Sequence, residues 1–214
     1  MKTSDRGIAA LVAHEGIVPA PYLDSVDVLT FGIGHTAAAG APDPAKMPRG
    51  MPTDLDAALH EVFAVFRRDL ARYEADVMRA VKVPIEQHEF DALLSFHFNT
   101  GAIARADLVK ALNRGDRHAA ASGFMNWRKP AVIIPRRQAE QALFVRGEYP
   151  AGRVVVWQVD AGARVIWKAA RTLTVDEVLA RLRPPEPAAE ALTLEIIAAR
   201  VAALEAAVAA LKGA

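Results

Sequence analysis

Apolar residues recur at helical spacing over most of the middle of the chain. The longest stripe covers residues 54–80, where an apolar side chain returns every three or four positions and predicts one long helix. Residues 37–53, just before it, are rich in alanine, glycine and proline and predict a loop with no helix. Because the later connections are short, residues 54–147 are expected to form a compact helical lobe. Its other helices are predicted at 86–99, 107–113, 116–127 and 136–147.

The N-terminal part predicts a helix followed by extended chain. Residues 4–15 have apolar positions at helical spacing, and Pro19 and Pro21 prevent that helix from continuing. Residues 22–35 carry β-forming side chains on both sides of a turn at 25–27, which indicates a small hairpin.

The pattern changes after residue 150. Two apolar runs within 154–167 flank a turn at 160–162 and predict a second hairpin. A capping box then predicts a helix over about 174–183. Trp157 and Trp167 are expected to form the core of this small unit, with stacking on sugars as the alternative.

The end of the chain has a regular seam of apolar residues. Over 190–212 they step by three and four positions, which favours pairing with another helix. Self-association and contact with a membrane surface are both hypotheses for this segment, but its recurring charges argue against spanning a bilayer. The expected divisions are 1–149 as catalytic domain, 150–183 as hairpin and helix, 184–189 as proline-rich linker and 190–214 as amphipathic helix.

Composition limits the possible partners. Of the 214 residues, 52% are hydrophobic and 24% charged, which is typical of a globular protein, and the net charge of +1 with no clustered basic face predicts no nucleic-acid partner. The absence of cysteine excludes disulfides and thiolate metal sites. The apolar part of the N-terminus is too short for a signal peptide, so we expect the chain to stay in the cytoplasm until another factor releases it.

Two acidic residues and a threonine near the N-terminus are the candidates for chemistry. Glu15 lies at the end of the first predicted helix, and Asp24 and Thr30 lie on the first predicted hairpin. Two carboxylates facing each other across a cleft can hydrolyse a glycosidic bond by acid–base catalysis. Spacing alone favours a second interpretation, in which Glu15 stabilises a helix end and Asp24 a turn.

Several motifs in the same order resemble one family. They are Glu15-Gly16, Tyr22-Leu23-Asp24, the stretch 30–36 (TFGIGHT), 96–101 (FHFNTG), 112–115 (LNRG), Trp127 and 135–144 (PRRQAEQALF). Together they cover roughly residues 5–148 and resemble the tailed-phage lysozymes, or endolysins, of glycoside hydrolase family 24. The resemblance implies an α+β, two-lobed lysozyme-like fold, in which a long helix joins a small hairpin lobe to a larger helical lobe.

The resemblance also implies a reaction and roles for individual residues. The substrate would be the β-1,4 bond between N-acetylmuramic acid and N-acetylglucosamine in bacterial peptidoglycan. Glu15 would be the general acid, Asp24 would activate the attacking water, and Thr30 would hold that water or steady Asp24. The outcome would be inversion, with no metal and no cofactor. After synthesis in the host cytoplasm, a holin-type pore would release the enzyme to the wall.

Three further residues are expected to bind or support the substrate. The resemblance implies that His35 supports the cleft by pairing with a nearby acid, although simple packing would also explain it. Phe98 and Asn99 lie at the end of a predicted helix, where Asn99 could reach a sugar and also cap the helix before Gly101. In contrast, we expect Arg136, Arg137 and Glu140 to form ion pairs on the surface of the helical lobe, outside the site.

The chain departs from the family pattern in the turn of its first hairpin, and two other functions compete with the hydrolase prediction. Asp27 stands where many relatives have glycine, but aspartate tolerates left-handed turn geometry, so the hairpin should survive. A lytic transglycosylase would need no base, so the presence of Asp24 and Thr30 argues against it. The other alternative is a non-catalytic wall-binding or virion protein that oligomerises through its C-terminal helix.

Overall fold

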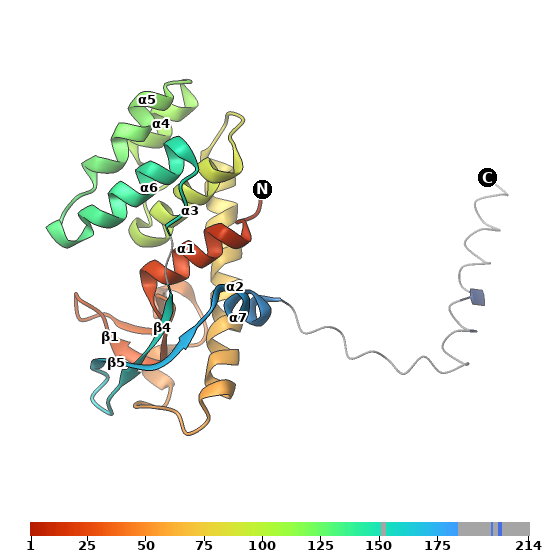
Figure 1. Ribbon diagram of the computed structural model, residues 1–214, viewed down its shortest axis with the longest axis vertical. Helices are drawn as coiled ribbons and strands as arrows, with labels where there is room; N and C mark the ends of the chain where they lie inside the picture. The colour runs from red at the N-terminus through yellow and green to blue at the C-terminus, as the bar shows by residue number, and fades with distance from the viewer. Residues whose placement is uncertain (151–152, 184–197, 199–200, 203–214) are drawn as a thin grey trace. The chain divides into compact units, whose positions relative to one another are not determined.

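Figure 1 shows the computed structural model, which describes residues 1–150, 153–183, 198 and 201–202. Packing contacts separate Met1–Leu182 from Arg183–Ala214, and the description below concerns the first of these units. The predicted linker at 184–189 and, apart from three residues, the predicted helix at 190–214 lie outside the described residues.

The elements of this unit follow the predicted order of helix, strands, helices, hairpin and helix. The helices are α1 (Asp5–Glu15), α2 (Leu55–Ala80), α3 (Gln87–Thr100), α4 (Asp107–Asn113), α5 (Arg117–Gly123), α6 (Ile134–Arg146) and α7 (Val175–Leu182). The strands are β1 (Val18–Leu23), β2 (Leu29–Gly32), β3 (His35–Thr36), β4 (Val154–Val159) and β5 (Val165–Leu173). None of the helices in the described ranges is both long and apolar enough to cross a membrane.

The two lobes of the expected lysozyme-like fold are present. Helices α3 to α6 gather at one end of the unit, the strands lie at the other, and α2 runs past both (Figure 1). The buried face of α2 contributes Leu59, Val62, Phe63, Phe66 and Val77 to one continuous core. The apolar stripe at 54–80 predicted one long helix, and that prediction is confirmed. A single helix can pack against both lobes only if it has an apolar face along its whole length.

The first sheet has the antiparallel order β1-β2-β3. Tyr22 pairs with Thr30, and Thr30 pairs with Thr36, so these side chains share one face of the sheet. Phe31 and His35 form the neighbouring pair and therefore occupy the opposite face, toward α2, where both are buried. One face of the sheet thus packs on the core through Phe31 and His35, and the other carries Tyr22, Thr30 and Thr36.

The second hairpin is attached to β1. The amide of Ile17 donates to the carbonyl of Val155 at 3.0 Å, the amide of Trp157 donates to that of Ile17 at 2.8 Å, and the amide of Leu23 donates to that of Ala163 at 2.8 Å. As a result β1, which connects Glu15 to Asp24, has hydrogen-bonded neighbours on both sides. The turn of β4 and β5 and the first sheet pack as parts of one compact unit.

The structure corrects several local predictions. The loop at 37–53 contains two short 3-10 turns, Ala37–Ala39 and Pro44–Lys46, the second begun by a proline and capped by Asp43. The predicted helix 116–127 ends at Gly123 and continues only as a 3-10 turn.

The expectation that both tryptophans form a core was wrong for Trp167. This side chain is 78% exposed, and Trp157 is half-buried. The reason is the attachment of β4 to β1, which gives the hairpin a core shared with the first lobe. The outer strand β5 then has no layer to pack against on its far side.

Candidate active site

Glu15 is the last residue of α1, and Gly16 ends that helix with a φ of 68°. At the other end of α1 the amide of Gly7 donates a hydrogen bond to Ser4 Oγ, which caps the helix. Glu15 Oε1 accepts a hydrogen bond from Arg136 Nη1 at 2.6 Å, while its side chain stays 19% exposed. The carboxylate is therefore oriented by α6 and still reachable from solvent.

A buried group of charges, here called the arginine cluster, surrounds this contact. It consists of Glu15, Ser95, Arg136, Arg137 and Glu140. Arg136 donates from Nε to Glu140 Oε1 at 3.0 Å and from Nη2 to the Ser95 carbonyl at 3.1 Å. Arg137 Nη1 lies 2.9 Å from Glu140 Oε2, and the Ser95 hydroxyl donates to Glu140 Oε1 at 2.8 Å.

Placing Arg136, Arg137 and Glu140 on the surface was wrong. Their exposed fractions are 9%, 0% and 2%. On α6 these positions fall on the same helical stripe as Leu143 and Phe144, which is the buried stripe. Buried charges are tolerated here because every one of them has an opposite charge beside it.

The protonation of His14 follows from the same cluster. Burial and, next, the Arg136 guanidinium lower the pKa of His14 to about 4, against the opposing effect of Glu15. Near pH 7 the imidazole is therefore neutral. Arg136 is left as the cation that faces Glu15.

Asp24 and Thr30 meet at the backbone of Val28. Asp24 Oδ1 accepts hydrogen bonds from the amides of Val26 at 2.9 Å and Val28 at 2.8 Å. The Thr30 hydroxyl donates to the Val28 carbonyl at 3.1 Å, so Thr30 steadies Asp24 through the turn rather than by direct contact. Asp27 has a φ of 60°, the left-handed geometry expected where relatives have glycine.

Tyr22 links the two carboxylates electrostatically. Burial, followed by the negative charges of Glu15 and Asp24, raises the pKa of Tyr22 well above its usual range. One phenol therefore lies within reach of the fields of both acids. Since Glu15 and Asp24 stand at opposite ends of β1, with Tyr22 between them, the strand itself sets their separation.

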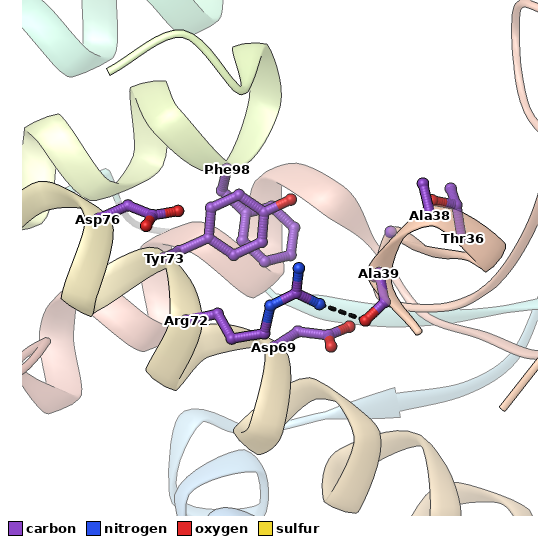
Figure 2. A pocket seen from close by; sticks show the side chains of 9 residues that line it. Thr36, Ala38, Ala39, Asp69, Arg72, Tyr73, Asp76 and Phe98 are labelled. Atoms are coloured by element: carbon purple, nitrogen blue, oxygen red, sulfur yellow. Dashed lines mark hydrogen bonds between the residues drawn. The ribbon is translucent and has the colours of Figure 1, made fainter. Parts of the chain in front are cut away.

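A cleft of about 200 Å³ is lined by residues that include Thr36, Asp69 and Phe98 (Figure 2), and Glu15, Asp24 and Thr30 are not among its lining residues. It lies between β3 and the middle of α2, and the side chain of Arg72 is held over it by a hydrogen bond to the Ala39 carbonyl. The rings of Tyr73 and Phe98 lie side by side, with centroids 4.7 Å apart. Gly34 lines the same cleft.

The contacts of His35 fit a supporting role and not a direct contact with substrate. Its Nδ1 lies 2.6 Å from Asp69 Oδ2 and its Nε2 lies 2.8 Å from the Pro42 carbonyl oxygen. The side chain is 1% exposed and both ring nitrogens are engaged. The expectation that His35 binds substrate itself is corrected on this ground, whereas the expected pairing with an acid is present.

Phe98 and Asn99 lie near the end of α3, and of the two only Phe98 lines the cleft. Asn99 is exposed, and its Oδ1 accepts a hydrogen bond from Arg137 Nη2 at 2.7 Å, while Gly101 ends the helix in left-handed geometry. Among the described residues no acceptor is paired with the amide protons of Asn99, whose side chain is exposed.

Comparison with known proteins gives the site its context. The sequence profile named "Phage lysozyme" matches residues 12–140 of this chain. The chain belongs to the phage lysozyme family. It is therefore a glycoside hydrolase, and the family resemblance seen in the sequence is confirmed.

Individual relatives support the same assignment. The chain is 34% identical over 151 residues to an endolysin of Salmonella phage P22, covering 68% of this chain and 99% of the relative. It is 31% identical over 147 residues to a SAR-endolysin of Escherichia phage Mu, covering 64% and 78% of the two chains. An endolysin structure from the Escherichia coli O157:H7 phage FAHEc1 superposes with a TM-score of 0.59 at 28% identity, covering 71% of this chain and 98% of that chain.

Two residues beside the candidate catalytic pair of this phage lysozyme were missed in the sequence. The sequence motif that contains Tyr22 predicts no separate role for it, and the prediction for Arg136 is a surface position. The signal for Arg136 was available, because it shares the stripe of Leu143 on α6. Within the described part of the chain, no group of three or more His, Asp or Glu side chains is arranged to hold a metal ion.

We expect Gly34→Ala to lower kcat/KM strongly while lowering the free energy of unfolding only modestly. A Cβ at Gly34 would lie 3.1 Å from Phe98 Cε1 and 3.8 Å from Glu15 Oε2, so it would intrude between the acid and the cleft wall. The φ of 72° adds a backbone cost of about 1–2 kcal/mol. Measuring kcat/KM on peptidoglycan, we expect a loss of about tenfold or more, since small displacements in a catalytic site cost that much.

Gly115→Ala is the matched control. Gly115 also has a positive φ, 85°, but nothing lies within 4 Å of its added Cβ. The two variants should lose similar stability in urea unfolding, and only Gly34→Ala should lose activity. Equal activity in both would contradict the proposed place of Gly34 in the site.

Proposed function

We propose that Glu15 is the general acid and Asp24 the general base with which this muramidase hydrolyses the β-1,4 bond between N-acetylmuramic acid and N-acetylglucosamine. The observation that supports the proposal is the position of the two acids in the chain: Glu15 ends α1 just before β1, and Asp24 directly follows β1, so one short strand carries a carboxylate near each end. A pair of carboxylates in this relation is the equipment of glycoside hydrolysis.

The protein groups divide the reaction between them. Glu15 donates its proton to the glycosidic oxygen as the bond to the anomeric carbon breaks. A water attacks that carbon from the other face and gives its proton to Asp24, so one water is consumed and the configuration is inverted. Thr30 can accept a hydrogen bond from this water, because its own proton is already donated to Val28.

Arg136 orients the acid in this scheme. It binds Oε1 of Glu15, and Oε2 is the oxygen that lies near Gly34 at the cleft. A proton on Oε2 is compatible with the hydrogen bond from Arg136 to Oε1. The exposed amide of Asn99 is proposed to bind a sugar hydroxyl or acetamido group, with Phe98 as part of the same wall.

Mass spectrometry of the products tests the reaction directly. Digestion of purified sacculi should release fragments that end in reducing N-acetylmuramic acid. Anhydro-muramyl ends would instead identify a lytic transglycosylase, which needs no base. Failure to release any fragment would leave a wall-binding protein that has kept the fold.

We also propose that the enzyme resides in the host cytoplasm before lysis and reaches the wall through a holin-type pore. Family membership alone does not decide this, since relatives include SAR-endolysins. Fractionation of producing cells, with and without a co-expressed holin, tests it: activity should leave the cytoplasmic fraction only with the holin. Self-association through residues 190–212 remains a separate proposal, which sedimentation of the full chain against a chain ending at residue 183 would test.

A further inference from the structure

The hairpin of β4 and β5 lies outside the stretch that matches the phage lysozyme profile, which ends at residue 140. Nevertheless it is bonded to the strand that carries the proposed base. The amide of Leu23, the residue before Asp24, donates to the carbonyl of Ala163 in the turn between β4 and β5 at 2.8 Å. The position of this turn relative to Asp24 is therefore fixed by the backbone.

A groove of about 550 Å³ lies where the hairpin meets the end of β1. Tyr22, Asp24 and Asp27 line it on one side, and Arg164, Val165 and Trp167 line it on the other. The volume is in the range of about 300–1,000 Å³ found for small-ligand pockets. Asp24, the proposed base, is itself one of the residues that line this groove.

Trp167 is the unusual residue of this groove. Its side chain is 78% exposed, although a tryptophan carries one of the largest apolar surfaces of any residue. Trp157 packs against it edge-to-face, with ring centroids 5.4 Å apart. Trp157 in turn lies against Gly16, where a Cβ would meet its indole nitrogen at 2.9 Å. These contacts join the exposed ring through Trp157 to the chain at Gly16, and Trp167 lines the same groove as Asp24.

We propose that this groove is a glycan subsite, in which Trp167 stacks on the apolar face of an N-acetylhexosamine ring of the peptidoglycan strand. The inference rests on the proposed function, since it takes the strand that is cut to be the strand that is bound. A polymer cleaved at Glu15 and Asp24 must continue beyond the cleaved bond, and the groove that shares Asp24 receives the continuing sugars. Arg164 and Asp27 supply polar partners at its rim.

The test is binding of glycan chains of two lengths by full-length Glu15→Gln protein, which leaves the chains intact. Peptide-free chains of eight or more sugars, prepared from sacculi, are compared with disaccharide. We expect Trp167→Ala to raise the Kd for the long chains about three- to tenfold, the size of one aromatic contact, and to leave the Kd for disaccharide unchanged. Trp167→Phe should retain most of the affinity. In the active enzyme, Trp167→Ala should raise KM and leave kcat unchanged.

Ile166→Ala is the matched control. Ile166 is 43% exposed on the same strand, and it does not line the groove. An unchanged Kd for long chains in Trp167→Ala, or an equal loss in Ile166→Ala, would overturn the subsite. Failure of the proposed function gives a different result, because wild-type protein would then release no reducing N-acetylmuramic acid ends whatever residue stands at position 167.

Discussion

Glu15→Gln protein is expected to clear peptidoglycan about a hundredfold to ten-thousandfold more slowly than the wild type. Loss of a general acid costs about 10²–10⁴ in rate, and the leaving sugar has no other proton donor in the proposed mechanism. Glutamine keeps an oxygen that can accept the hydrogen bond of Arg136 at the position of Oε1. The fold should therefore survive, and the loss should fall on kcat. Release of reducing sugar ends from purified sacculi measures it.

The control for this result is Glu148→Gln. Glu148 forms an exposed ion pair with Arg146 and lies away from the cleft. Its activity and thermal midpoint should match the wild type. Clearing by Glu15→Gln at the rate of Glu148→Gln would remove Glu15 from the role of acid.

Glu140→Gln is expected to have the largest effect on stability, with a loss of about 3–5 kcal/mol in the free energy of unfolding. The Glu140 carboxylate lies between the guanidiniums of Arg136 and Arg137 in the arginine cluster. Removing its charge leaves two buried cations with only Glu15 to balance them. Urea unfolding at neutral pH, followed by circular dichroism, gives the difference.

The same exposed pair supplies the comparison for stability. Removing the charge of Glu148 should leave the free energy of unfolding close to that of the wild type, because an exposed ion pair is screened by solvent. Activity of Glu140→Gln should also fall, since Arg136 would lose one of the partners that hold it against Glu15. If Glu140→Gln were as stable as Glu148→Gln, the cluster would not be a stabilising element of the fold.

The helices could be predicted because their apolar stripes are local and complete. The stripe at 54–80 is the clearest case, and α2 covers Leu55–Ala80. Glu15 and Asp24 could be placed on a helix end and a hairpin for the same reason. The order of the family motifs, and not the spacing of the two acids, is what favours catalysis over simple capping as the prediction for Glu15 and Asp24.

The arginine cluster could not be placed by a rule that keeps charges outside. Arg137 is fully buried, with Glu140 beside it on α6 and Asn99 reaching it from α3, and a local pattern does not show the contact between the two helices. The attachment of the second hairpin is likewise invisible to local patterns. Ile17 and Val155 are far apart in sequence, and neither segment has a residue pattern that predicts which strand it pairs with.

The pairing of Ile17 with Val155 and Trp157 also has a consequence for biosynthesis. A ribosome adds roughly 5–20 residues per second, so β1 emerges many seconds before the strand that flanks it. Until then the strand between Glu15 and Asp24 has an open side, and the ring of Trp157 is not yet beside Gly16. The segment around β1 is synthesised early, but its pairing with β4 can form only after residues 154–159 have been synthesised. The proposed active site is therefore completed late in translation.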